Sequence, residues 1–111
     1  MKFANEIDLS VARDDVFAFV ADQRNIPLWN YYVVDVRQER GNGPAVGARY
    51  HQTRKTDSQI TEITQMAPGE SLTVETVAGT PVVRRHIAFR QTRRGTRLID
   101  SWDLATGYPA A

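Results

Sequence analysis

The chain has 111 residues, of which 41% are hydrophobic and 24% are charged, a composition typical of one globular domain. Fourteen Lys and Arg against thirteen Asp and Glu leave a net charge of +1, which excludes an overall basic field for binding nucleic acid. With no cysteine and only His51 and His86, neither a disulfide framework nor a metal site is expected. No stretch approaches the roughly 18 apolar residues of a membrane-spanning helix, and no targeting signal stands at the N-terminus. We therefore expect a cytoplasmic protein.

The N-terminal part predicts one strand and two helices. Residues Lys2 to Leu9 alternate between two faces, as in a strand that is covered on one side. From Ala12 to Asp22 the apolar residues follow a helical period, with acidic residues in the first turn, where they suit the helix dipole. The segment Asn25 to Asn30 is short, but its Pro27 is tolerated in a first turn, so we expect one or two turns of helix.

The rest of the chain predicts strands joined by short turns, because Val, Ile, Thr and Tyr dominate and turn residues recur at short intervals. The breaks are expected at Gly41–Pro44, Lys55–Asp57, Pro68–Gly69, Gly79–Thr80 and Arg93–Gly95. The six strands are expected at Val33–Arg40, Val46–Arg54, Ser58–Met66, Ser71–Ala78, Val82–Gln91 and Thr96–Ala105. Residues 1–111 are therefore expected to form a single α+β domain with an antiparallel sheet.

Short connections fix the pairing of the last three strands. A turn over Thr92–Gly95 sets Phe89 opposite Leu98, and a two-residue turn at Gly79–Thr80 sets Ala78 opposite Pro81. Both turns predict the same inward face. Its members are Leu72, Val74, Thr76, Val83, Arg85, Ile87, Phe89, Leu98, Asp100 and Trp102.

Two opposite charges interrupt this apolar face. Arg85 and Asp100 become diagonal neighbours on adjacent strands, close enough for their side chains to meet. A charge enclosed alone is unfavourable, so the two side chains either satisfy each other or await a polar group of a ligand. The residues that alternate with this inward face, His86 among them, are expected to face solvent.

Several short strings, in their order and spacing, resemble one known family over essentially the whole chain. They are Ile7-Asp8, Asp14-Asp15-Val16-Phe17, Asp22, Ile26–Asn30, Val46–Tyr50, Thr61-Glu62-Ile63 with Pro68-Gly69, and Ile87-Ala88-Phe89 with Gly95–Leu98. The chain is similar to the START-like, helix-grip (SRPBCC) superfamily, and within it to the polyketide cyclase and dehydrase-like group. The resemblance implies a curved seven-stranded antiparallel sheet around a cavity for a lipid, sterol, polyketide or aromatic molecule, with no obligatory cofactor.

The end of the chain departs from that family pattern. Family members usually close the cavity with a long C-terminal helix, whereas this chain ends at Tyr108–Ala111, where that helix would begin. An uncovered concave face would expose a large apolar patch, which monomeric soluble proteins avoid. We therefore expect either a homodimer or a missing C-terminal helix.

Each candidate site residue has a chemical and a structural interpretation. Asp100 as a general base, with Arg85 stabilising an enolate, would suit an aldol cyclisation or a dehydration. The structural interpretation, a satisfied ion pair or a ligand-orienting pair, is favoured over it. The expected ligand-binding residues are Trp29, Tyr31, Tyr50, Val74, Arg85, Ile87, Phe89, Leu98, Asp100 and Trp102, although the aromatic ones are alternatively ordinary core residues.

Three interpretations of the function remain. We favour a protein that binds a hydrophobic or amphipathic small molecule, and the alternative is a polyketide cyclase or dehydrase. A third interpretation is a regulatory module that docks through its open concave face. Arginines crowd the segment Arg84–Arg97 and suit a phosphate or an anionic head group, but a solvated hairpin explains them as well and is preferred.

Overall fold

A computed structural model describes residues 1–104 of the chain. The two short helices are α1 (Arg13–Ala21) and α2 (Ile26–Trp29), with a single 3₁₀ turn at Gln23–Asn25 between them. The strands are β1 (Lys2–Leu9), β2 (Val33–Arg40), β3 (Arg49–Arg54), β4 (Ser58–Ala67), β5 (Ser71–Ala78), β6 (Val83–Gln91) and β7 (Thr96–Leu104). In this part of the chain no helix is long and apolar enough to cross a membrane.

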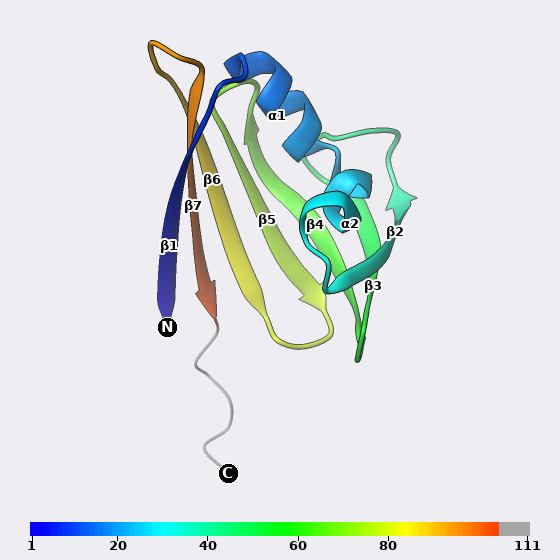
Figure 1. Ribbon diagram of the computed structural model, residues 1–111. Helices are drawn as coiled ribbons and strands as arrows, with labels where there is room; N and C mark the ends of the chain where they lie inside the picture. Colours follow the sequence, from blue (N-terminus) through cyan, green and yellow to red (C-terminus); the bar gives the residue numbers. More distant parts are fainter. Residues whose placement is uncertain (105–111) are drawn as a thin grey trace.

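All the strands belong to one antiparallel sheet. Their order is β1-β7-β6-β5-β4-β3-β2, so the N-terminal strand pairs with β7 and each later strand pairs with its neighbour in sequence. Figure 1 shows both helices on the same face of the curved sheet, with α1 across one end of it and α2 near β2. This arrangement confirms the predicted α+β fold with a seven-stranded antiparallel sheet.

The expected strand boundaries hold except at a few ends. β3 begins at Arg49 rather than at Val46, because Ala45–Ala48 forms a turn in which the Ala48 amide donates to the Ala45 carbonyl over 3.0 Å. Gly47 lies in this turn at a φ of +90°, a conformation that glycine adopts without strain. The expected end of the last strand at Ala105 and the chain end at Tyr108–Ala111 lie outside the described residues.

The predicted pairing of the last three strands is confirmed across both connections. Phe89 pairs with Leu98 and Arg85 with Trp102, and on the other side Val74 pairs with Arg85. The β5–β6 connection is longer than the two residues expected at Gly79–Thr80, because β5 ends at Ala78 and β6 begins only at Val83, but the register predicted from that turn is kept. Pro81 explains the difference, since proline has no amide hydrogen to donate to a strand ladder.

The packed core lies beneath the helices. Its buried members include Val16 and Ile26 from the helices and Tyr50, Ile63 and Leu72 from the central strands. At the other side of the molecule, near β1 and β7, large apolar side chains stay partly exposed. They include Phe3, Ile7, Val11, Phe19 and Trp29. The helices therefore leave part of the concave face open.

Candidate functional site

Two adjoining cavities lie between the helices and the concave face of the sheet. The first has a volume of about 180 Å³; β3, β4 and β5 give it one wall of mostly polar side chains, and the rest of its lining is mainly apolar. We call it the polar cavity after that wall. The second has a volume of about 600 Å³ and a mostly apolar wall from β1, α1 and β7. Val20, Trp29 and Ile87 line both, so the cavities meet at these residues.

The ion pair expected from the strand register stands at this junction. Arg85 Nε donates to Asp100 Oδ1 over 2.9 Å, and both side chains are largely buried. The guanidinium carbon also lies 5.9 Å from the Trp29 ring centroid and 5.0 Å from that of Trp102. Arg85 lines the polar cavity and Asp100 lines the apolar one. The pair therefore joins the two cavities.

Buried polar side chains form one wall of the first cavity. Gln52, Gln59 and Thr61 are all less than a tenth exposed, and all three line this space. Gln52 lies directly opposite Gln59 on the neighbouring strand. The Thr61 hydroxyl oxygen is buried without a hydrogen-bond partner among residues 1–104. Such groups are normally satisfied, so this wall is a site where a polar ligand atom or a water would be held.

These polar residues were missed from sequence because the pairing of β3 with β4 was not worked out. The break expected at Lys55–Asp57 contained the signal. A short connection there places Thr53 opposite Ser58 and Gln52 opposite Gln59, as the structure shows. The same connection places Thr61 opposite Tyr50.

The charges on the wall of the first cavity are each accompanied by an opposite charge. Arg54 Nε lies 3.0 Å from an oxygen of Asp57 but makes no hydrogen bond within residues 1–104, and the Arg54 guanidinium also covers the Tyr32 ring. Glu75 lies 4.0 Å from Arg84, on the neighbouring strand. Together with the Arg85–Asp100 pair, these contacts leave the cavity polar but balanced in charge.

The structure distributes the sequence-predicted ligand-binding residues over four environments. Those that line one or both cavities are Trp29, Val74, Arg85, Ile87, Leu98 and Asp100. Tyr50 and Phe89 are buried in the core, where Phe89 contacts Phe17 edge to face. Trp102 stacks on Phe3 at the edge formed by β1 and β7. Tyr31 is 80% exposed beneath the ammonium of Lys55, which places it outside the candidate site.

The core position of Tyr50 also affects its acidity. Burial raises the pKa of the Tyr50 hydroxyl above its ordinary value, and the carboxylate of Asp22 adds to the effect. The hydroxyl donates to the Gly43 carbonyl over 3.4 Å. Tyr50 is therefore a neutral residue that secures the loop before β3.

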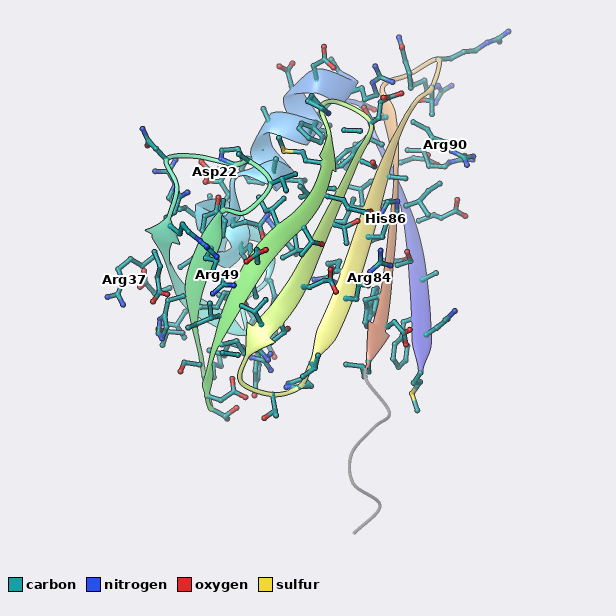
Figure 2. The ribbon with its side chains drawn as sticks, turned by 180° about the vertical axis from the view of Figure 1, so that it is seen from behind. Asp22, Arg37, Arg49, Arg84, His86 and Arg90 are labelled. Carbon is teal, nitrogen blue, oxygen red and sulfur yellow. The ribbon has the colours of Figure 1, made fainter. Side chains whose placement is uncertain are left out.

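Neither histidine takes part in the concave site. Figure 2 shows His86 with Arg84 and Arg90 along β6 on the face turned away from the helices, the parity expected to face solvent. Its ring nitrogen Nδ1 lies 2.9 Å from the hydroxyl of Thr73. Among the described residues no cluster of three His, Asp or Glu side chains is placed to hold a metal ion.

Comparison with solved structures relates this architecture to known proteins. A protein of Deinococcus radiodurans has a TM-score of 0.77 and 16% identity, with 94% of this chain and 83% of that chain covered. Ara h 8.0201 has a TM-score of 0.76 and 16% identity, with coverages of 100% and 80%. The major latex-like protein 151 of Panax ginseng has a TM-score of 0.76 and 13% identity, with coverages of 94% and 78%. No family model and no curated protein matches the sequence.

Proposed function

We propose that this protein, which has the helix-grip fold of START-like proteins, binds a hydrophobic or amphipathic small molecule on the concave face of its sheet. The observation that carries the proposal is the apolar cavity of about 600 Å³, which has a size usual for small-molecule sites and adjoins a polar cavity. Lipids, polyketides and flat aromatic molecules all combine an apolar body with few polar atoms. They are therefore the classes we assign to it.

The wall of the apolar cavity supports this assignment. Ile7, Leu98 and Phe19 supply aliphatic and aromatic surface from three different elements. Covering such surface is favourable by about 25 cal/mol for each Å² removed from water. Because Ile7 and Phe19 are each 43% exposed, a ligand has apolar surface left to cover.

Binding is tested with the purified protein and one apolar fluorescent probe, diphenylhexatriene. We expect saturable binding at micromolar concentration and, in native mass spectrometry, a co-purified small molecule. Ile7→Lys places a charge on the wall of the apolar cavity and should weaken probe binding at least about tenfold. Val46→Lys is the matched control, because Val46 is exposed and lies outside both cavities.

Two results would contradict the binding proposal. If diphenylhexatriene, fatty acids and flat aromatic molecules all fail to bind below millimolar concentration, and no molecule co-purifies, the cavities are not a ligand site. Equal weakening by Ile7→Lys and Val46→Lys would place the probe elsewhere on the surface.

A second candidate function follows from the position of the ion pair. Asp100 lines the apolar cavity beside the guanidinium of Arg85, so a bound poly-β-ketone would meet a carboxylate base and a cation together. Asp100 would accept a proton from the carbon between two carbonyl groups, and Arg85 would stabilise the enolate oxygen. Aldol closure followed by loss of water would then give a cyclic product.

Mass spectrometry tests this cyclase or dehydrase activity. A poly-β-ketone substrate should lose the mass of one water only in the presence of the protein, and Asp100→Asn should abolish the loss. If the wild-type protein and Asp100→Asn give the same product at the same rate, binding without catalysis is the function.

A further inference from the structure

The polar cavity has an unusual wall for the interior of a small domain. Gln52, Gln59 and Thr61 are 9%, 5% and 5% exposed, and they come from β3 and β4. Gln52 and Gln59 face each other across the two strands, and Thr61 pairs with Thr76 of β5. The wall therefore spans three neighbouring strands, and Figure 1 shows α2 in front of this side of the sheet, over β4.

This wall offers neutral donors and acceptors. Gln59 Nε2 donates to the Pro81 carbonyl over 2.9 Å, which fixes the amide and leaves its carbonyl oxygen to accept. The Thr61 hydroxyl, buried without a partner in the described part of the chain, is able both to donate and to accept. A buried hydroxyl without a partner is unfavourable, so the site is complete only when a polar group occupies it.

The charges around the wall argue against a charged occupant. Glu75 lies 4.0 Å from Arg84, and Arg85 lies 2.9 Å from Asp100. Arg54 lies 3.0 Å from Asp57, but its Nε is buried without a hydrogen-bond partner among residues 1–104, so the oxygen of a neutral hydroxyl or carbonyl group is able to accept from it. A carboxylate that enters this cavity would lose its hydration and would compete with an existing anion for each guanidinium. A hydroxyl or a carbonyl group needs only the neutral donors and acceptors that the wall presents.

We propose that the polar cavity is a subsite for an uncharged hydrogen-bonding group, and that the ligand is a neutral amphipathic molecule such as an alcohol or an ester. This inference rests on the proposed ligand-binding function. The apolar part of the molecule extends past Trp29 and Ile87 into the larger cavity. Thr61 and Gln52 are then the residues that select a neutral polar end over a carboxylate.

The test compares ligands with the same chain and different polar ends. Diphenylhexatriene, which has no polar atom, reports occupancy of the apolar cavity, and 1-decanol, methyl decanoate and decanoate compete with it at pH 8. We expect the alcohol and the ester to displace the probe at concentrations at least about tenfold lower than decanoate. A neutral molecule also partitions better into any apolar cavity than a carboxylate does. The proposal is therefore decided by the variants that remove the polar side chains of the wall.

Thr61→Val keeps the shape of the side chain and removes the hydroxyl. We expect this variant to lower the affinity for 1-decanol by roughly fivefold to tenfold, while the affinity for the probe stays constant. Thr64→Val is the matched control, because Thr64 lies on the same strand, also has a buried hydroxyl oxygen without a partner, and is absent from both cavity walls. If Thr61→Val does not fold, Gln52→Leu takes its place, and we expect the same loss of affinity for 1-decanol with unchanged affinity for the probe.

The outcomes separate this inference from the function on which it rests. If the probe does not bind the wild-type protein, the proposed function itself fails. If the probe binds but decanoate competes as well as 1-decanol, or if Thr61→Val weakens 1-decanol no more than Thr64→Val does, the neutral subsite is overturned. In the last case the polar wall holds only water.

Discussion

Arg85 is held from several sides at once. Asp100 accepts a hydrogen bond from its Nε, and the rings of Trp29 and Trp102 lie within 6 Å of its guanidinium carbon. Cation–π contacts of this kind add to the ion pair when the group is partly removed from water. The charge therefore has its most favourable surroundings only while Asp100 is present.

Loss of one member of this pair should destabilise more than loss of both. Asp100→Ala leaves a largely buried guanidinium without its anion, and we expect the free energy of unfolding to fall by about 2 kcal/mol. The double variant Asp100→Ala with Arg85→Met removes the charge as well and should lose less. Urea denaturation of both variants measures the difference.

The exposed pair of Arg97 with Asp8 is the control for this comparison. The two side chains are 49% and 68% exposed, so Asp8→Ala should lower the free energy of unfolding by less than about 1 kcal/mol. If Asp100→Ala and the double variant lose the same amount, Arg85 and Asp100 do not depend on each other.

One carboxylate connects the three strands at the β2 edge of the sheet. Glu62 of β4 accepts hydrogen bonds from Arg49 of β3 and from Arg40 of β2. The two arginines lie opposite each other in the strand register, so Glu62 compensates their mutual repulsion. The Arg49 hydrogen bond, more than any other contact, holds the pKa of Glu62 below its ordinary value of 4.5.

The lowered pKa predicts a dependence of stability on pH. The folded state binds fewer protons than the unfolded state, so the contribution of Glu62 is present above pH 4.5 and is lost as the pH falls below it. Glu62→Gln should therefore flatten the loss of stability in this acid range, measured by urea denaturation at several pH values. Glu39→Gln, on the exposed surface of β2, is the control and should keep the wild-type slope. An unchanged slope in Glu62→Gln would contradict the prediction.

The β6–β7 turn packs closely against the segment between β1 and α1. Gly95 has a φ of +153°, and a Cβ there would overlap the Leu9 carbonyl oxygen and lie 2.7 Å from the Val11 nitrogen. The Thr96 hydroxyl donates to the Val11 carbonyl over 2.8 Å at the same place. This contact fixes where the chain leaves β1 to begin the first helix.

Substitution of Gly95 should therefore cost much more than the loss of glycine flexibility alone. We expect Gly95→Ala to lower the free energy of unfolding by more than about 2 kcal/mol, because backbone atoms must move. Gly47→Ala has a positive φ but open space around the added Cβ, so about 1 kcal/mol is expected there. Thermal denaturation compares the two, and equal losses would show that the turn is free to shift.

Local patterns predicted the elements and much of the pairing, but not the polar half of the site. Alternation and short turns sufficed for β1 and for the β6–β7 hairpin, so the Arg85–Asp100 pair was found. Gln52, Gln59 and Thr61 were missed because inward positions were derived only for the last three strands, although the short β3–β4 connection places these residues on the same face as Tyr50. Phe89 and Tyr50 were assigned to the ligand, since nothing in the sequence alone shows which part of the inner face the helices cover.

The two short helices cover only part of the concave face of the sheet. Among the described residues, the part of this face near β1 and β7 stays uncovered. Large apolar side chains along β1, the segment between β1 and α1, α1 and α2 are between 38% and 46% exposed. They are Phe3, Ile7, Val11, Phe19 and Trp29. We call this set the apolar rim. Exposed apolar side chains gathered on one side of a small protein mark a place where another molecule binds.

Four members of the apolar rim also line the apolar cavity, so a ligand covers their inner surface. We predict that a second copy of the chain covers Phe3 and the outer surface of the rim that a ligand leaves exposed. Covering apolar surface stabilises association by about 25 cal/mol for each Å², and a two-fold arrangement buries the same rim on both copies. Light scattering should therefore show a mass that rises with concentration toward twice 12.5 kDa. Phe3→Lys, which alters the rim outside both cavities, should shift the protein to the monomer, whereas Val46→Lys should not. A wild-type monomer at all concentrations, with cooperative unfolding and no binding of dyes to apolar surface, would mean that the rim is not an interface.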